Sequence, residues 1–289
     1  MSKLVKFSDI VLSLESGSRP KGGTKSIDTG VPSLGAEHLD ALGGFNFKKV
    51  KYIPEFFFDS QKKGRIEIGD ILIVKDGATT AKTSFVGTEF KFAKASINEH
   101  LFKVKVDETK ALPKYVYWHL FSPNGKNQIL KDFRGATVGG IGRSFIEKVF
   151  LPLPPLDAQK RIVAILDQAD ALRQKRKQAI ALLDEYVKSV FLEMFGDPVT
   201  NPKGWETTSL QSISKMSSGS TPSRDISEYY GGRIPWVKTT EVNYKFITNT
   251  EEFITDSGLK NSSCKLYPKD SILIAMYGQG KTRGKVGIL

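Results

Sequence analysis

The sequence predicts an α+β protein. A strand-rich domain with polar loops is joined to a long, coiled-coil-forming helix, and the start of a second copy of the same domain follows. Three observations predict this fold class. A stretch with helical periodicity and no Gly or Pro spans residues 157–195, sequence blocks on either side of it repeat about 200 residues apart, and short apolar runs are separated by Gly-, Ser- and Thr-rich stretches. We expect domains at residues 1–155, 156–195 and 196–289, the last one incomplete.

The helix follows a stiff, proline-rich segment. Pro154 and Pro155 fix their own φ angles and disfavour helix in the residues before them, and Asp157 then occupies a typical N-cap position. Gly196 and Pro198 end the pattern. A helix of about 38 residues is about 57 Å long, more than a compact domain needs, so we interpret it as a rigid spacer rather than a core helix. Its apolar stripe needs a partner helix and comprises Ile162, Ile165, Leu166, Ala169, Leu172, Leu183, Tyr186 and Val190.

Four sequence blocks that precede the helix return after it in the same order. The pairs are 16–20 with 218–222, 30–34 with 233–237, 69–74 with 269–274, and 82–87 with 285–287. Such an arrangement is not expected by chance, so it predicts two copies of one domain. The second copy stops at Leu289 without a counterpart of residues 97–150, and we therefore expect it to be incomplete.

Local patterns predict further elements within the domains. Residues 71–74, 101–106 and 272–275 are short apolar runs bounded by polar stretches, which is typical of buried strands. Residues 113–131 have helical periodicity, and Pro123 and Gly125 interrupt it.

The chain is basic, with 43 Lys and Arg against 31 Asp and Glu and a formal net charge of +12. Residues 1–155 contribute +8, residues 156–195 contribute +1 and residues 196–289 contribute +3. This excess suits a polyanionic partner such as nucleic acid, although a merely soluble basic protein would also show it.

Several classes of site are excluded by composition. The single cysteine, Cys264, cannot form an internal disulfide or a cysteine-based zinc site, and it favours a reducing cytosol. The three histidines have no metal-ligand spacing, so no metal site is expected. No apolar run is long enough to span a bilayer. We therefore expect a cytoplasmic protein with no membrane partner.

One segment resembles an enzyme motif. Residues 275–282 fit a relaxed P-loop pattern that ends in Lys281 and Thr282. This pattern gives an alternative from a different functional class, a nucleotide-hydrolysing enzyme. A P-loop needs a following helix whose N-terminus holds the phosphates, but glycines and only seven further residues follow. We expect no catalytic residue in this chain.

Cations and small hydrogen-bonding side chains on polar loops are the remaining candidates. Lys21, Lys25 and Arg143 are expected to contact phosphates, because flexible cations position a domain without reading bases. Contacts to base edges are expected from the loop after an apolar strand, through Thr79, Thr80 and Lys82. The whole candidate DNA-binding set is Arg19, Lys21, Thr24, Lys25, His38, Lys75, Thr79, Thr80, Lys82, Arg134, Arg143, Arg224, Lys238, Lys281 and Arg283.

Several segments resemble one family. The prolines and leucines of residues 151–156, followed by Gln-Lys-Arg-Ile-Val-Ala-Ile-Leu-Asp at 159–167, resemble the central region of type I restriction-modification specificity subunits. Residues 63–80, Phe-Gly-Asp-Pro at 195–198 and Asn-Pro-Lys-Gly-Trp at 201–205 resemble the same family. In that family, two target-recognition domains each read half of a split DNA site. Two long helices pack antiparallel, set the spacing and dock two methyltransferase subunits.

The resemblance implies a non-catalytic DNA-recognition subunit of a methyltransferase and endonuclease complex. The implied partners are double-stranded DNA, DNA methyltransferase (modification) subunits and a restriction/translocase subunit. The chain itself is expected to bind no cofactor, while S-adenosylmethionine, ATP and Mg belong to the partner subunits. A variant is a half-specificity subunit that pairs with a second copy of itself through residues 157–195. A scaffold that binds only protein is a third class, which an absence of DNA affinity would favour.

Overall fold

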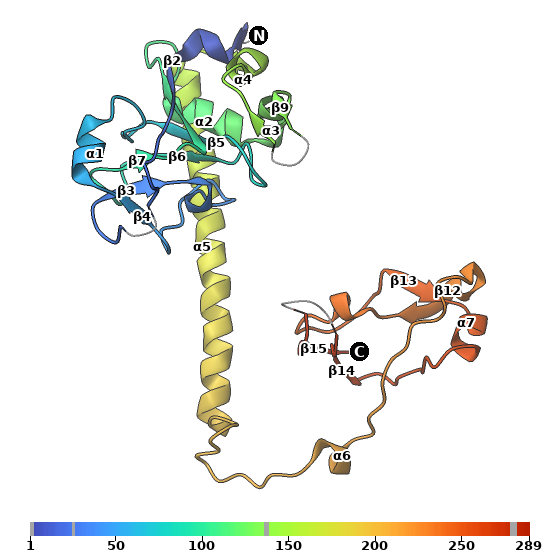
Figure 1. Cartoon of the computed structure of the whole chain (residues 1–289). Helices are drawn as coiled ribbons and strands as arrows, with labels where there is room; N and C mark the ends of the chain where they lie inside the picture. Colours follow the sequence, from blue (N-terminus) through green and yellow to red (C-terminus); the bar gives the residue numbers. More distant parts are fainter. Residues whose placement is uncertain (1–2, 25–26, 136–138, 278–281) are drawn as a thin grey trace. The chain divides into compact units, whose positions relative to one another are not determined.

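The computed structural model describes residues 3–24, 27–135, 139–277 and 282–289 (Figure 1). The chain divides into two compact units, Met1–Met194 and Phe195–Leu289, called unit 1 and unit 2 below. Helices and strands are mixed, and one long helix is flanked in sequence by strand-rich domains, which confirms the predicted fold class. Within the described ranges, no helix combines the length and apolar composition needed to cross a bilayer.

A four-stranded antiparallel sheet lies at the centre of unit 1. Its strand order is β2 (Val11–Ser16), β8 (Leu101–Val106), β5 (Ile71–Val74) and β6 (Thr83–Phe85). All four residues of β5 are 0% exposed, because β5 has a neighbour on each side and a covered face above and below. The predicted strands at 71–74 and 101–106 are therefore confirmed.

Each face of this sheet has its own apolar core. Side chains alternate between the two faces of a strand, so Ile71 and Ile73 enter one cluster while Leu72 and Val74 enter the other. The second cluster joins the sheet to a three-stranded sheet with the order β4 (Lys51–Ile53), β3 (Val31–Leu34) and β7 (Ser96–Ile97). A short helix, α1 (Glu55–Ser60), follows β4.

Helices cover the opposite face. The predicted interruption of residues 113–131 is confirmed, since α2 (Pro113–Phe121) ends before Ser122 and α3 (Pro123–Leu130) begins after it. The Ser122 hydroxyl oxygen accepts the Gly125 N–H at 3.1 Å and so caps α3. The remaining elements on the edges of unit 1 are β1 (Lys3–Lys6) paired with β11 (Phe150–Leu153), β9 (Phe133–Arg134) paired with β10 (Gly140–Ile141), and α4 (Phe145–Lys148).

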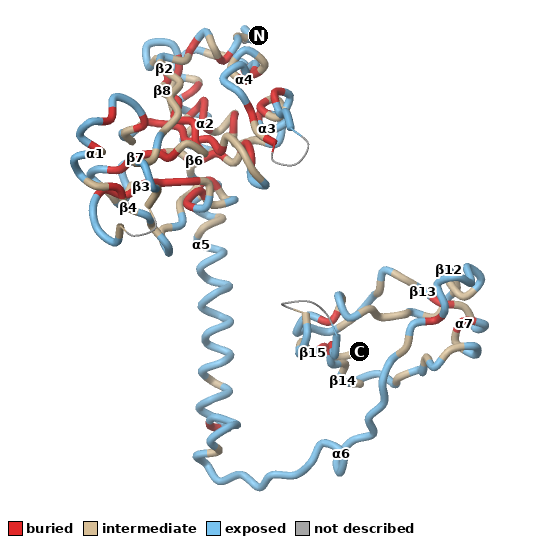
Figure 2. The backbone as a smooth tube through the Cα atoms, in the orientation of Figure 1, coloured by how far each residue is buried: buried red, intermediate tan, exposed pale blue. Residues whose placement is uncertain are grey.

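The long helix α5 (Leu156–Phe195) has 40 residues, and Asp157 lies in its first turn rather than at the predicted N-cap position. Its first turns are joined to unit 1. Gln159 is fully buried, accepts the Leu112 N–H at 2.9 Å and donates to the Pro154 carbonyl at 2.8 Å, and Val163 packs on the first core cluster. Contacts continue as far as Arg173, which donates to the Leu42 carbonyl at 2.6 Å, and the C-terminal half of the helix beyond it is mostly exposed, as its pale blue colour shows (Figure 2).

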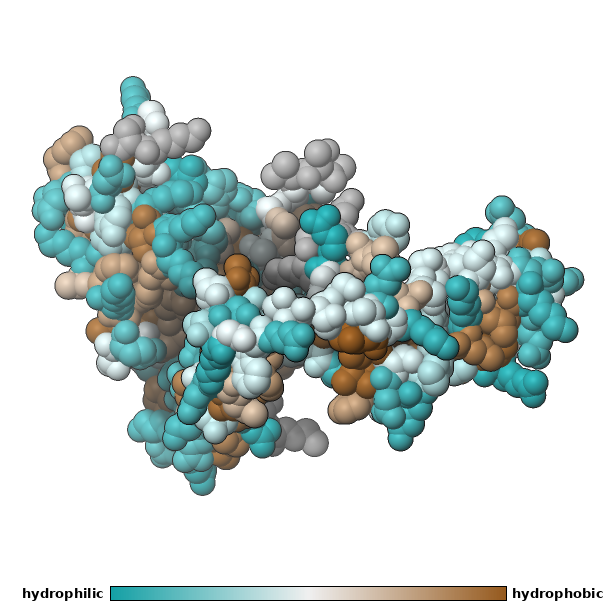
Figure 3. Space-filling model, turned by 90° about the horizontal axis from the view of Figure 1, so that it is seen from below, coloured by the Kyte–Doolittle hydropathy of each residue, from teal (hydrophilic) through white to brown (hydrophobic). Residues whose placement is uncertain are grey.

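The described residues of unit 2 form two antiparallel strand pairs, two short α-helices and two 3₁₀ turns. The elements are α6 (Leu210–Ile213), β12 (Tyr230–Trp236), β13 (Glu252–Ile254), α7 (Asp256–Lys260), β14 (Ile272–Ile274) and β15 (Val286–Ile288). β12 pairs with β13 and β14 pairs with β15, both antiparallel. Ile272 and Ile274 are 67% and 55% exposed, in contrast to the buried residues of β5. Figure 3 shows apolar residues at the surface of this unit, on the right of the view.

The two units share one hairpin geometry. In unit 1, the Val74 N–H donates to the Lys82 carbonyl at 2.8 Å, and the Ala81 N–H donates to the Val74 carbonyl at 2.9 Å. In unit 2, Ala275, Lys285 and Gly284 make the same two bonds at 2.9 and 2.8 Å. The hairpins β5–β6 and β14–β15 are thus equivalent in backbone bonding, and these bonds pair Val74 with Ala275, one residue beyond the Ile274 that the sequence repeat pairs with it.

Candidate nucleic-acid interface

Loops that are far apart in the sequence meet at one edge of unit 1. The Lys75 N–H donates to the His100 carbonyl at 2.8 Å, and the Ile141 N–H donates to the Lys75 carbonyl at 2.8 Å. The Gly77 N–H donates to the Gly139 carbonyl at 3.0 Å. Backbone bonds therefore fix the segments 75–82, 98–100 and 139–143 against one another.

A fourth loop is attached to the same edge. The Arg19 guanidinium lies 3.0 Å from the Glu99 carboxylate, and Arg143 donates to the Leu14 carbonyl at 2.7 Å. We call the surface made by residues 16–24, 75–82, 98–100 and 139–143 the loop face. Three of the loops that the sequence predicted to contact DNA therefore share one surface.

A chain of contacts between acidic and basic side chains runs across the loop face. His100 Nδ1 lies 2.6 Å from Asp76 Oδ1, and its Nε2 lies 3.5 Å from Glu99 Oε1. Lys75 Nζ lies 3.8 Å from the other oxygen of Asp76. Sequence reasoning missed Glu99 and His100 because it searched for cations and hydroxyls on loops. Their position directly before the apolar run of β8 is the signal that could have found them.

The predicted phosphate contacts differ in their availability. Lys21 and Arg143 are exposed, whereas Lys25 lies outside the described residues. Arg19 and Lys75 are paired with acids, as given above. These two cations would have to leave a carboxylate before they contacted a phosphate.

Arg134 lies beside a buried acid. Its guanidinium is 3.3 Å from Asp132, which also accepts hydrogen bonds from Lys148 and Ser144. Burial opposes ionisation of Asp132, but the hydrogen bonds from Lys148, Ser144 and the Gly142 N–H outweigh it and lower its pKa. Arg134 itself remains largely exposed.

His38 is a correction to the predicted DNA-binding set. Its side chain is only 1% exposed, Nδ1 accepts the Gly35 N–H at 2.8 Å, and Nε2 lies 3.1 Å from the Lys49 carbonyl. Glu241 occupies the equivalent place in unit 2, where it accepts the Lys238 N–H at 2.7 Å. Both side chains close a short helical turn, so His38 supports the backbone and is not available to DNA.

The residues predicted to contact base edges also differ in whether they are available to DNA. Thr79 is exposed, and Thr24 is half-buried. Thr80 is buried and donates its hydroxyl to the Gly77 carbonyl at 2.6 Å, so it belongs to the turn. Lys82 donates to the Leu39 carbonyl at 2.9 Å and points to the inside of the domain. Neither Thr80 nor Lys82 is free to read a base edge in this arrangement.

Two of the four candidate cations of unit 2, Arg224 and Lys238, are held by acids. Arg224 lies 2.7 Å from Glu252 and stacks over Tyr230 and Trp236, with 4.5 and 5.0 Å to the ring centroids. Lys238 lies 2.8 Å from Glu251 and 3.0 Å from Glu252. Hydrogen bonds with these acids raise the pKa of both cations. Arg283 is exposed, and Lys281 lies outside the described residues.

The P-loop alternative does not match the described geometry. After β14, the chain returns through Gly284 and Lys285 into β15, which pairs antiparallel with β14. A P-loop leads instead from a strand into a helix whose N–H groups hold the phosphates. Thr282 lies at the return of a hairpin, so the alternative reading of this segment as a nucleotide site is not supported.

The predicted apolar stripe of α5 lies away from the body of unit 1. The helix contacts that body through residues including Gln159, Val163 and Asp167, the last of which accepts the Trp118 indole N–H at 2.9 Å. Leu172 and Leu183 are 54% and 61% exposed. Of the other stripe residues, Ile162, Ile165, Ala169 and Tyr186 are exposed, whereas Leu166 and Val190 are half-buried. Ile180 and Val187 extend the exposed stripe and were missing from the prediction.

Comparison with known proteins gives consistent matches. Residues 3–182 and 202–289 match the model of the type I restriction modification DNA specificity domain. The type I restriction enzyme MjaIX specificity subunit of Methanocaldococcus jannaschii is 27% identical over 205 residues, covering 65% of this chain and 47% of that protein. The EcoR124I/EcoR124II specificity subunit of Escherichia coli is 29% identical over 219 residues, covering 71% of this chain and 50% of that protein. This chain thus spans about half the length of the curated relatives it matches.

Solved structures share the fold. A chain from a study of complex assembly and conformational transition of the type I R-M system has a TM-score of 0.52 and 17% identity, covering 99% of this chain and 71% of that chain. The type I restriction-modification system S subunit from M. genitalium has a TM-score of 0.51 and 14% identity, covering 99% and 68%. The fold is therefore shared, and the family model matches well over half of the sequence. This chain belongs to the family of type I restriction-modification DNA specificity domains.

Proposed function

We propose that the chain is a non-catalytic DNA-recognition subunit of a type I restriction-modification complex, and that unit 1 reads one part of a split DNA target. The observation that carries the proposal is the loop face, where four separate loops are held together at the edge of a buried sheet. Loops on a rigid scaffold are the usual place for recognition. The charge of +8 in residues 1–155 supports a polyanionic partner.

The loop face divides into contacts that position DNA and contacts that read it. Lys21 and Arg143 position the domain on phosphates, and Lys25 joins them from the same loop as Lys21. Thr79 offers a short donor and acceptor to base edges. Arg19 and Lys75 exchange their carboxylate partners for DNA when the complex forms.

Unit 2 reads the second part of the target in this proposal. Arg283 and Lys281 lie in the segment that joins β14 to β15, equivalent to the loop of Thr79 in unit 1. Arg224 and Lys238 contact DNA only after they release Glu252. We therefore expect the exposed Arg283 to contribute more to binding than Arg224 and Lys238.

The proposed protein partners are the DNA methyltransferase (modification) subunits and a restriction/translocase subunit in the cytoplasm. The chemistry resides there, with S-adenosylmethionine on the methyltransferase and ATP and Mg on the restriction assembly. The exposed stripe of α5 supports docking of a helix, because a contiguous apolar stripe in water is a typical interaction site.

Substitution of Thr79 and Lys21 tests the division of roles. Thr79→Ala is expected to cost roughly 1–3 kcal/mol of binding at one half of the target and to relax specificity there. Lys21→Ala is expected to weaken binding to all sequences equally and to lower the salt slope by about 0.9. Methylation sequencing of cells that carry the chain with its methyltransferase subunit identifies the target, and binding to that duplex gives the affinities. A full chain with no affinity for duplex DNA would overturn the proposal in favour of a protein-binding scaffold.

A second candidate function is a half-specificity subunit that acts as a homodimer. The observation that favours it is again the stripe on α5, which is long enough to pair with the same helix of a second copy. Light scattering of the purified chain decides between the two, because a dimer supports self-pairing and a monomer supports docking of another subunit's helix.

A further inference from the structure

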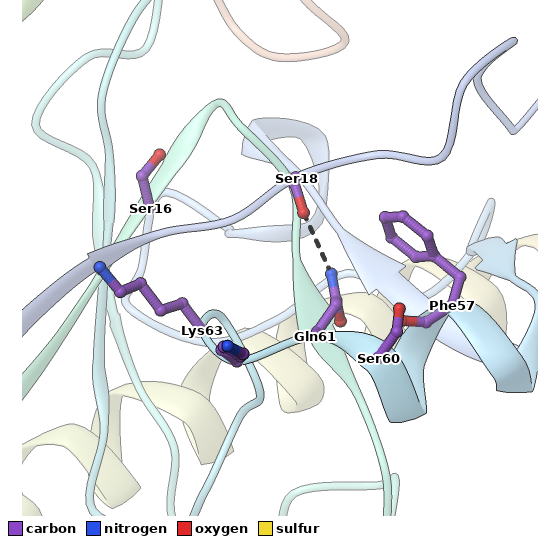
Figure 4. A pocket seen from close by; sticks show the side chains of 7 residues that line it. Ser16, Ser18, Phe57, Ser60, Gln61 and Lys63 are labelled. Atoms are coloured by element: carbon purple, nitrogen blue, oxygen red, sulfur yellow. Dashed lines mark hydrogen bonds between the residues drawn. The ribbon is translucent and has the colours of Figure 1, made fainter.

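A hollow of about 370 Å³ opens in unit 1 between the end of β2 and the segment after α1 (Figure 4). Its lining includes Ser16, Ser18, Phe57, Ser60, Lys62 and Lys63. In Figure 4, Ser16 and Lys63 lie on one side of Ser18, and Phe57 and Ser60 lie on the other. We call it the serine–lysine hollow. Ser16 and Ser18 belong to the loop face, so the hollow adjoins it.

The backbone around the hollow is fixed by close approaches. A Cβ atom at Gly17 would lie 1.8 Å from the Ile97 carbonyl oxygen, so only glycine fits between β2 and β7. The Gly64 N–H donates to Glu15 at 2.7 Å, and the Ile97 N–H donates to the Gly64 carbonyl at 2.8 Å. Three chain segments are thereby locked together, and the hollow is a preformed feature of the fold.

Hydrogen bonds around the hollow leave donors pointing into it. Gln61 is nearly buried, and its carbonyl oxygen accepts the Ser96 hydroxyl at 2.9 Å, which directs its amide nitrogen to Ser18 at 3.4 Å. Ser18 accepts this contact and keeps its own hydroxyl hydrogen for a ligand. Ser60 differs, because its hydroxyl donates to the Phe57 carbonyl at 2.7 Å.

The charge of the hollow is entirely positive. Lys62 and Lys63 are exposed, no lining residue is acidic, and neither lysine pairs with a carboxylate in the described part of the chain. The two ammonium groups and the free hydroxyl group all donate hydrogen bonds. The ligand that suits them carries negative charge and only accepts hydrogen bonds. The ring of Phe57 adds an apolar wall against which a sugar can pack.

We propose that the serine–lysine hollow seats a phosphodiester group of DNA beside the loop face, an inference that rests on the proposed function. Continuity with Arg19 and Lys21 favours DNA over a free phosphate, since a strand that crosses the loop face passes the hollow. The lysine pair distinguishes unit 1 from unit 2. β4 and β5 are separated in sequence by the same number of residues as β13 and β14. This equal separation makes Ser263 and Cys264 the counterparts of Lys62 and Lys63, so unit 2 lacks the lysine pair.

The test compares two lysine pairs in the full chain. K62A/K63A is expected to lower the slope of log affinity against log salt by about 0.9 on a mixed-sequence duplex, the loss of one phosphate contact. K48A/K49A removes the same charge from another pair of adjacent exposed lysines of unit 1, outside the hollow, and is expected to change the slope less. K62R/K63R keeps both charges and is expected to retain the wild-type slope.

A serine pair gives an independent arm. Ser18→Ala is expected to weaken binding to all duplex sequences a few-fold, whereas Ser60→Ala is expected to leave it unchanged because that hydroxyl already has an acceptor. Thermal unfolding verifies that all of these variants fold.

The outcomes distinguish failure of the hollow from failure of the proposed function. A wild-type chain that does not bind duplex DNA overturns both the proposed function and the hollow. Binding with equal slopes for K62A/K63A and K48A/K49A overturns the hollow alone. A last outcome overturns the assignment to DNA. In it, inorganic phosphate raises the unfolding temperature of the wild type but not of K62A/K63A, and the two proteins have the same slope of log DNA affinity against log salt.

Discussion

At the scale of single residues, buried polar groups of unit 1 hold the backbone that carries the loop face. His38 accepts one N–H and contacts one carbonyl, as described above. His38→Ala would leave both groups without a partner inside the domain, which is expected to cost roughly 2 kcal/mol of unfolding free energy. His38→Gln keeps an acceptor and a donor and is expected to lose less. Urea unfolding gives the stabilities, and unchanged DNA affinity of the folded His38→Ala variant supports a structural role.

Asp70 makes stability depend on pH. Burial raises the pKa of Asp70 to about 6, although Lys103, the Glu67 N–H and Lys105 act in the opposite direction. Its Oδ2 atom accepts the Glu67 N–H at 2.7 Å, and Oδ1 has no partner among the described residues. The folded state therefore holds a proton that the unfolded state releases near pH 4. This stabilises the fold below about pH 4, and the contribution disappears as the pH rises through about 6.

Asp70→Asn tests this linkage, because an amide does not titrate. The unfolding free energy of the wild type, measured relative to that of Asp70→Asn, is expected to fall by roughly 2–3 kcal/mol between about pH 4 and pH 6. Chemical unfolding at a series of pH values gives this difference. A constant difference across that range would show that Asp70 titrates as an ordinary carboxyl group.

At the scale of elements, the β5–β6 hairpin carries a strained residue. Ala81 has a φ of 67°, a left-handed conformation that costs non-glycine residues roughly 1–2 kcal/mol, and Gly284 has a φ of 86° at the equivalent position of unit 2. Ala81→Val is expected to destabilise unit 1 by more than this amount, since a branched side chain tolerates the conformation least and the site is buried. Ala81→Gly is expected to be tolerated. Comparison of their thermal unfolding tests the prediction, and equal unfolding temperatures would contradict it.

Elements with strong local signals could be predicted from the sequence, but their pairing could not. The apolar run of β5, the uninterrupted pattern of α5 and the break before Pro123 are all local features. The parallel pairing of β3 with β7 and the pairing of β1 with β11 join distant segments, and no local pattern specifies them. The candidate site follows the same rule. Its loops are visible in the sequence, whereas the burial of His38 and the contact of its Nε2 atom with the Lys49 carbonyl arise only when the chain folds.

At the scale of the whole molecule, the two units use the same hairpin with different charges around it. Unit 1 has exposed cations at Lys21, Lys62 and Lys63, whereas Arg224 and Lys238 of unit 2 are bound to acids. Residues 1–155 carry +8, and residues 196–289 carry +3. The chain is therefore expected to bind DNA mainly through unit 1 at low salt, with unit 2 contributing less to the electrostatic attraction.

The stripe on α5 gives the last prediction, because assembly depends on a surface that is separate from the loop face. Leu172→Glu with Leu183→Glu places two charges on the exposed stripe without touching the residues that join α5 to unit 1. Association with a second copy or with the methyltransferase subunit is expected to be lost, since a charge in an apolar helix interface has no partner.

Ala164→Glu with Gln178→Glu is the matched control. It adds the same charge at exposed positions that helical spacing places on another face. Sedimentation and pull-down measure the assembly, while DNA binding by unit 1 in the full chain is expected to persist in both variants. If the stripe variant assembles as well as the control, α5 docks its partner through another face.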